Sequence, residues 1–212
     1  MTTLILVRHA ETVAHAENRY TGVREVELTR TGADQAMALR DWAMDAQLTA
    51  IWSSPLSRCQ LTAAPTALAT GLPVTIDDRL REVDFGLLDG MTASEAHALY
   101  PEMMEAFWQD PVANHFPGGE PPGDAVERAV SALREIAHAT PDGRTLVVAH
   151  STLIRLILCH VLGASLSAYR TNFPLLDNCA LTTLRIKEDR LGLMGYNVPI
   201  ANAYSTQQKV QR

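Results

Sequence analysis

The sequence has no long hydrophobic run and few cysteines, and both shortages exclude classes of protein. Its longest apolar stretch, from Leu153 to Gly163, contains Arg155 and His160 and is too short to cross a bilayer. The amino terminus does not resemble a signal peptide. The chain has three widely spaced cysteines: Cys59, Cys159 and Cys179. An odd, scattered set predicts free thiols in a reducing cytoplasm. We therefore expect a cytoplasmic protein with no membrane partner, disulfide framework or metal site.

Lysine is almost absent as well, because only Lys187 and Lys209 occur among 18 basic residues. The preference for arginine reflects either genomic base composition or a need for bidentate phosphate contacts, and the sequence leaves both open. The net charge of −6 argues against a nucleic-acid partner. With no internal repeat or low-complexity segment, residues 1–212 are expected to form one domain. The sequence is compatible with a homodimer.

Alternating strands and helices make up the amino-terminal part. We expect strands at Thr3–Val7, Ala50–Trp52 and Pro73–Ile76. Two helices separate these strands, one capped by Thr29 and one running from Ser57 to Gly71. The expected inward side chains are Ala36, Leu39 and Ala43 on the first helix and Leu61, Ala64 and Leu68 on the second. This order predicts an α/β fold with three αβα layers around a mostly parallel sheet.

The alternation of strands and helices stops between residues 83 and 143, where we expect an inserted helical lid over the sheet edge. Thr92 and Glu95 form a capping-box pattern that opens a helix running towards Met104. Asp124 and Glu127 have the same spacing before a second helix. Its expected buried stripe is Val126, Ala129, Val130, Leu133, Ile136 and Ala137.

The core pattern resumes after the insertion. A strand at Thr145–Ala149 leads into a buried helix that starts at Ser151 or Thr152. Cys179–Ile186 and Arg190–Tyr196 alternate on either side of a turn, which predicts a hairpin. The polar tail from Ala203 is expected to be poorly ordered.

Two strands end directly at a histidine. The first runs into Arg8-His9 and the later one into His150, and ligands of open α/β sheets bind at such carboxyl ends. A histidine can attack phosphorus if one ring nitrogen is free and an acceptor fixes the other as N–H. Arg58, at the start of a helix near the same edge, adds a cation. Glu82, where the chain enters the insertion, could supply the proton that a leaving group needs. The pattern predicts phosphoryl chemistry.

The chain resembles the histidine phosphatase superfamily, also called phosphoglycerate mutase-like, and specifically its phosphatase branch. Five motifs carry the resemblance, in the family's order and over nearly the whole chain to Ile186. They are Arg8-His9-Ala10-Glu11-Thr12, Leu28-Thr29-Arg30-Thr31-Gly32, Ser53-Ser54-Pro55-Leu56-Ser57-Arg58, Leu80-Arg81-Glu82-Val83-Asp84-Phe85-Gly86 and Val148-Ala149-His150.

The resemblance implies a role for each matching residue and no cofactor. His9 would carry the phosphoryl group, and Arg8, Arg58 and His150 would bind its oxygens. Glu82 would act as the acid and then as the base for water.

The sequence departs from the family pattern at three positions, and one further loop could contact the substrate. Ala10 and Ser151 replace glycines, and His15 stands where the family often has a phosphate-binding asparagine. Thr21-Gly22 matches a loop that often touches the substrate. The expected substrate contacts are therefore His15, Thr21, Gly22 and Ser151.

Charge in the insertion bears on the substrate. Residues 83–127 contain nine acidic side chains and no lysine or arginine. Such a lid would repel a doubly anionic substrate. We therefore expect a metal-independent phosphomonoesterase that acts on a small metabolite, namely a sugar, polyol or nucleoside phosphate. The alternatives are a phosphoglycerate-type mutase, a protein phosphohistidine phosphatase and an inactive binding module.

Overall fold

The computed structural model describes residues 1–200, so the tail from Ala203 lies outside the described part. The strands are β1 (Thr2–Arg8), β2 (Ala50–Ser53), β3 (Val74–Ile76), β4 (Arg144–Ala149), β5 (Leu181–Lys187) and β6 (Arg190–Val198). The α-helices are α1 (Val13–Ala16), α2 (Arg30–Asp45), α3 (Ser57–Thr70), α4 (Ala93–Leu99), α5 (Pro101–Gln109), α6 (Pro122–Ala139), α7 (Ser151–Leu162) and α8 (Tyr169–Asn172). Three 3-10 turns are η1 (Asp78–Leu80), η2 (Gly86–Leu88) and η3 (Leu166–Ala168).

The strands form one six-stranded sheet in the order β3-β2-β4-β1-β5-β6. β3, β2, β4 and β1 are parallel, whereas β5 and β6 form the expected antiparallel hairpin at one edge. β1 and β4 are neighbours, with Arg8 opposite Ala149. The two strand ends that deliver His9 and His150 therefore lie side by side.

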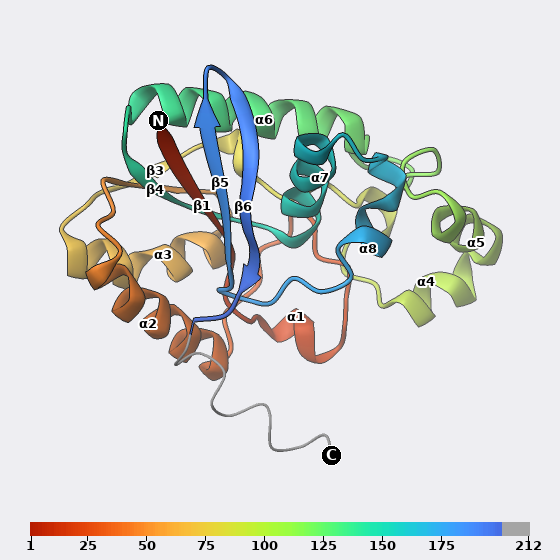
Figure 1. Cartoon of the computed structure of the whole chain (residues 1–212). Coiled ribbons are helices and arrows are strands. Elements are labelled where there is room, and N and C mark those ends of the chain that lie inside the picture. Colours follow the sequence, from red (N-terminus) through yellow and green to blue (C-terminus); the bar gives the residue numbers. More distant parts are fainter. Residues whose placement is uncertain (201–212) are drawn as a thin grey trace, which may run out of the picture.

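The layers follow from the alternation of side chains along β1. Leu4 and Leu6 belong to a core cluster with α6 and α7, whereas Ile5 and Val7 belong to a second cluster with α2 and α3. Figure 1 shows α6 above the central strands, α7 to the right of β6, and α2 and α3 below the strands. The predicted three-layer α/β architecture is confirmed. No helix within residues 1–200 is long and apolar enough to span a membrane.

The prediction for α2 is confirmed, but the buried face of α3 differs from the expected one. Leu61 and Leu68 are 51% and 88% exposed, and Ala64 is exposed as well. The buried face instead carries Arg58, Cys59, Thr62, Ala63 and Thr66. Thr62 faces inward because its hydroxyl accepts a hydrogen bond from the Ala10 amide at 2.9 Å. Apolar spacing alone could not reveal that preference.

Gly32, in the first turn of α2, lies very close to the loop after β1. A Cβ at this position would lie 2.0 Å from the carbonyl oxygen of Glu11. We expect Gly32→Ala to lower the free energy of unfolding by about 2 kcal/mol, because backbone atoms must move apart. Gly123, in the first turn of α6, is the matched control, since a Cβ there meets nothing within 4 Å. Urea denaturation of both variants checks this, and equal stabilities would contradict the close approach.

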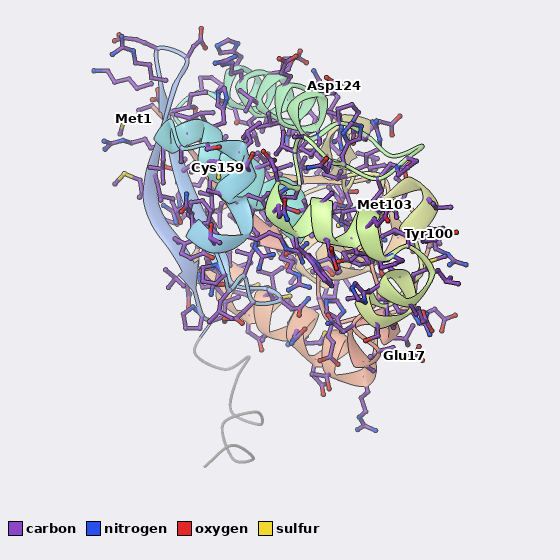
Figure 2. All side chains as sticks on the ribbon, turned by 90° about the vertical axis from the view of Figure 1, so that its right-hand side faces the viewer. Met1, Glu17, Tyr100, Met103, Asp124 and Cys159 are labelled. Carbon is purple, nitrogen blue, oxygen red and sulfur yellow. The ribbon has the colours of Figure 1, made fainter. Side chains whose placement is uncertain are left out.

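The expected insertion has a different carboxyl-terminal boundary. α6 bears the predicted buried stripe, and its side chains belong to the core cluster of β1 and α7. α6 is therefore a layer helix, and Asp124 lies inside its first turn rather than at its cap. Val83 still packs in that core cluster, and the segment that leaves the layers after it is residues 84–121, called the lid segment below. Figure 2 shows Tyr100 and Met103 on one flank and Asp124 apart from them at the top.

The lid segment contains two helices where the sequence suggests one. The capping box of Thr92 and Glu95 is present and starts α4, but this helix ends at Leu99 and α5 starts at Pro101. The two helices enclose a small core of their own: Leu88, Ala96, Met104, Phe107 and Phe116.

Candidate functional site

His9 stands directly after β1 in the middle of the sheet. Its backbone amide donates to the Ala149 carbonyl at 3.0 Å, and its Nδ1 lies 2.8 Å from the Ala10 carbonyl oxygen. A carbonyl can only accept, so Nδ1 carries the proton and Nε2 is left with its lone pair. Ala10 has a negative φ, which an alanine adopts in place of glycine without strain. The strand end thus supplies the fixed tautomer that the sequence argument requires.

The surroundings of His9 favour the neutral imidazole. Burial is the main reason that its pKa lies well below the ordinary value, and the positive charges of Arg58 and Arg8 lower it further. The side chain is only 6% exposed. His9 is therefore an uncharged base surrounded by cations.

Arg58 and His150 lie buried next to His9, with neither exposed to solvent. Arg58 donates to the carbonyls of Arg24 and Gly22, each at 2.7 Å, and lies 3.2 Å from His150 Nδ1. His150 Nε2 lies 2.7 Å from Ser54 Oγ. The ring centroids of His9 and His150 are 5.3 Å apart. Both nitrogens of His150 are thus engaged inside the protein, and burial holds its pKa well below the ordinary value.

Arg8 and His15 form a second contacting pair in the site. Arg8 donates to the Leu176 carbonyl at 2.7 Å, and its Nη2 lies 2.5 Å from His15 Nε2. Asn178 donates to the His9 carbonyl at 2.7 Å, a contact that no sequence motif indicated. Burial, followed by the charge of Arg8, lowers the pKa of His15 to about 4.

Glu82 reaches the start of α7. Its carboxylate accepts hydrogen bonds from the backbone amides of Val83, Thr152 and Leu153, each at 3.0 Å. The residue is 4% exposed, yet it lines the same pocket as His9. Glu82 and His9 therefore line the same cavity from different parts of the chain.

The cavity has a volume of about 200 Å³. Of the predicted site residues, six line it: Arg8, His9, His15, Thr21, Glu82 and Ser151. Arg58 and His150 lie behind its wall. Gly22 does not line the cavity. Its carbonyl accepts a hydrogen bond from Arg58 instead.

Sequence reasoning missed several lining residues, above all Arg155 and Arg170. Arg155 lies four positions after Ser151 on α7, so helical spacing alone places both on one face. Arg170 follows an irregular connection and gave no such signal. Within residues 1–200, no three histidine, cysteine or acidic side chains gather as a metal site.

The three depressed histidines predict acid sensitivity. His9, His15 and His150 resist protonation when folded, but in the unfolded chain each titrates near about 6.5. The unfolded state therefore binds more protons as the pH falls from about 6.5 towards 4, and stability is lost in that window. We expect the free energy of unfolding to be at least about 2 kcal/mol lower at pH 5 than at pH 7. Urea titrations at both pH values check this.

A variant tests the assignment of this effect. His15→Asn removes one titrating group, so its stability should depend less steeply on pH than that of the parent chain. An unchanged slope would contradict the contribution of His15.

Comparisons with known proteins agree with this geometry. The model of the histidine phosphatase superfamily (branch 1) matches residues 4–199. The chain is 33% identical over 198 residues to phosphoserine phosphatase 1 of Hydrogenobacter thermophilus, covering 93% of both chains. It is 31% identical over 210 residues to a probable phosphoglycerate mutase, GpmB, of Salmonella choleraesuis, covering 97% of this chain and 94% of the relative.

A solved structure gives the same answer for the fold. YhfR of Bacillus stearothermophilus superimposes with a TM-score of 0.89 at 26% identity, covering 96% of this chain and all of that one. The chain belongs to branch 1 of the histidine phosphatase superfamily, and the enzyme class that this family indicates is a phosphatase.

Proposed function

We propose that this protein is a metal-independent phosphomonoesterase that works through a phosphohistidine at His9. The observation that carries the proposal is the state of His9: buried, uncharged, with Nδ1–H held by the Ala10 carbonyl and Nε2 unprotonated. A neutral imidazole with a fixed tautomer is the nucleophile that phosphoryl transfer to nitrogen requires. The substrate is a small phosphate monoester that fits the cavity of about 200 Å³.

The reaction has two steps. In the first, the Nε2 lone pair forms a bond to phosphorus while the bond to the alcohol oxygen breaks, and the departing oxygen takes a proton from an acid. In the second, water attacks phosphorus, the P–N bond breaks and its electron pair returns to Nε2. The hydrogen bond from Nδ1–H to the Ala10 carbonyl stabilises the positive charge of the phosphorylated His9 ring between these steps.

Arginines supply the charge that stabilises the phosphoryl oxygens. Arg8 lines the cavity beside His9. Arg58 lies behind it, and its shielded Nε has no hydrogen-bond partner in the part of the chain that the structure describes. Such a donor is costly to leave unpaired, and a phosphoryl oxygen would satisfy it. His150 contributes by holding the Arg58 guanidinium, and contacts phosphate only if one of its present hydrogen bonds is released.

Glu82 is the proposed acid for the leaving group and then the base for water. Among residues 1–200, it is the one acidic residue that lines the cavity. The backbone amides of α7 hold its carboxylate in place, and an orientation this constrained suits proton transfer at one fixed position.

The substrate expectation needs one revision. None of the nine acidic residues of 83–127 lines the cavity, because Phe85 and Ala93 are its only contributions from that range. The acidic composition therefore lies outside the site. A sugar, polyol or nucleoside phosphate remains a candidate, but charge in the insertion no longer favours it.

The alternatives differ in where the phosphoryl group goes. A mutase returns it to a second position of the substrate, as the name of the Salmonella relative indicates for that protein. A protein phosphohistidine phosphatase must admit a side chain of another protein. We favour a phosphatase because the relative with the higher identity carries that name.

Phosphate release distinguishes these functions. The purified protein, treated with a chelator, is incubated with a panel of phosphomonoesters, a phosphoglycerate and a phosphohistidine peptide. We expect phosphate release from at least one small ester and an acid-labile, alkali-stable phosphoenzyme. Positional exchange without net release would establish a mutase instead, and preferential turnover of the peptide would establish the protein phosphatase.

A further inference from the structure

Three arginines that line the cavity have no part in the proposed reaction, and one of them, Arg19, is neutralised by Glu17 and Glu95. The other two have no such partner in the described part of the chain. Arg155 comes from α7 and Arg170 from α8, and both line the cavity that holds His9. Neither forms an ion pair with an acidic residue anywhere in residues 1–200. Unneutralised cations in a cavity indicate an anionic ligand.

Arg155 is partly buried and incompletely bonded. Its Nη2 donates to the Pro174 carbonyl at 3.1 Å, which fixes the side chain against the connection before β5. Its Nε is shielded from solvent and finds no acceptor among the described residues. A shielded donor of this kind is costly unless a ligand completes it.

Arg170 is held by aromatic rings rather than by a carboxylate. Its guanidinium carbon lies 5.5 Å from the ring centroid of Phe107 on the lid segment and 5.9 Å from that of Tyr169. Ring faces stabilise the cation and leave its N–H groups free for a planar acceptor. Burial is the main reason that the pKa of Arg155 lies below its ordinary value, and the positive charge of Arg170 lowers it further.

We propose that Arg155 and Arg170 form a second anion subsite that binds a carboxylate of the substrate while Arg8 and His9 hold its phosphate. The proposal rests on the proposed function. The substrate class is then a phosphate monoester of a small hydroxy acid or amino acid. A carboxylate matches the planar fork of arginine and adds little volume, which suits a cavity of about 200 Å³.

Matched substrates test the subsite. O-phosphoserine and O-phosphoethanolamine differ only in the carboxylate. We expect kcat/KM to favour O-phosphoserine by at least about tenfold, and Arg170→Gln and Arg155→Gln each to reduce this preference by about tenfold, mainly through KM. Arg134→Gln removes the same charge from the exposed face of α6 and should leave the preference intact.

Binding separates failure of the subsite from failure of the proposed function. Calorimetry with His9→Ala gives dissociation constants for both esters without turnover. Tighter binding of O-phosphoserine, lost on addition of Arg170→Gln, supports the subsite even if the parent chain releases no phosphate. Equal binding overturns it, even if phosphate release proceeds, and so does stronger selection of a bisphosphate. If Arg155→Gln does not fold, the exposed Arg170 decides the question.

Discussion

Replacing His9 with alanine is expected to reduce phosphate release by at least about 10⁴-fold, to the background rate. The reason is that the first step of the proposed reaction forms a bond to Nε2, and no other imidazole is available to replace it. The neighbouring rings of His150 and His15 lie 5.3 Å and 5.7 Å away between centroids. Both nitrogens of His150 are engaged by Arg58 and Ser54. In His15, Nε2 lies next to Arg8 Nη2 and Nδ1 accepts from the Thr12 amide. Phosphate release under saturating substrate measures the loss, and acid-quench labelling should show no phosphoenzyme.

The control for this variant is His138→Ala. His138 lies on α6 and contacts Asp189 near the hairpin turn, far from the cavity in sequence and fold. It should retain parental activity. If His9→Ala kept more than a small fraction of the rate while remaining folded, His9 would not be the nucleophile, and the proposed mechanism would be wrong.

The second large effect is expected at Arg58. Arg58→Met should lower kcat/KM by about 10²–10³-fold, since a preorganised donor for developing charge is lost. It should also lower stability, because the carbonyls of Gly22 and Arg24 lose their donor in a buried place. Arg58→Lys should recover only part of both, because one ammonium cannot span the two carbonyls and His150 at once.

The pH profile separates catalysis from folding at this position. The charge of Arg58 is the second cause of the lowered pKa of His9, after burial. Without that charge the pKa of His9 rises, and the acidic limb of kcat/KM should move towards neutral pH. Arg134→Met, on an exposed surface, should leave the profile in place. An unmoved profile in a folded Arg58→Met protein would show that Arg58 does not act on His9.

The site residues that stand at strand ends could be predicted from the sequence, whereas two arginines that line the cavity from helices were missed. Arg8, His9 and His150 could be predicted because parallel strands bring their carboxyl ends to one edge of a sheet. The sequence did not predict that β1 and β4 are neighbours, because this depends on the order of the strands in the sheet. The layers followed from alternation along β1, where Leu4 and Ile5 face opposite sides.

Apolar composition and net charge do not determine which way a side chain points, and two predictions were wrong for this reason. The apolar spacing of α3 predicts Leu61 and Leu68 on its inner face, yet Thr62 is buried instead, because its hydroxyl accepts a hydrogen bond from the Ala10 amide. The insertion was judged by its net charge, although only its cavity-lining side chains matter to a substrate. Arg155 and Arg170 belong to elements that reach the cavity only after the chain has folded around it.

The place of β1 in the sheet has a consequence for how the protein acquires its activity. β1 is the first strand, yet its partners are β4 and β5, and Thr3 pairs with Arg144 and Arg185. Contacts this distant in sequence form slowly, because a long loop must close before they give any stability. During synthesis, His9 is made long before Ala149, whose carbonyl accepts the hydrogen bond of its backbone amide. The cavity around His9 can therefore form only after β4 and β5 have been synthesised, and until then β1 is an apolar strand without its sheet neighbours.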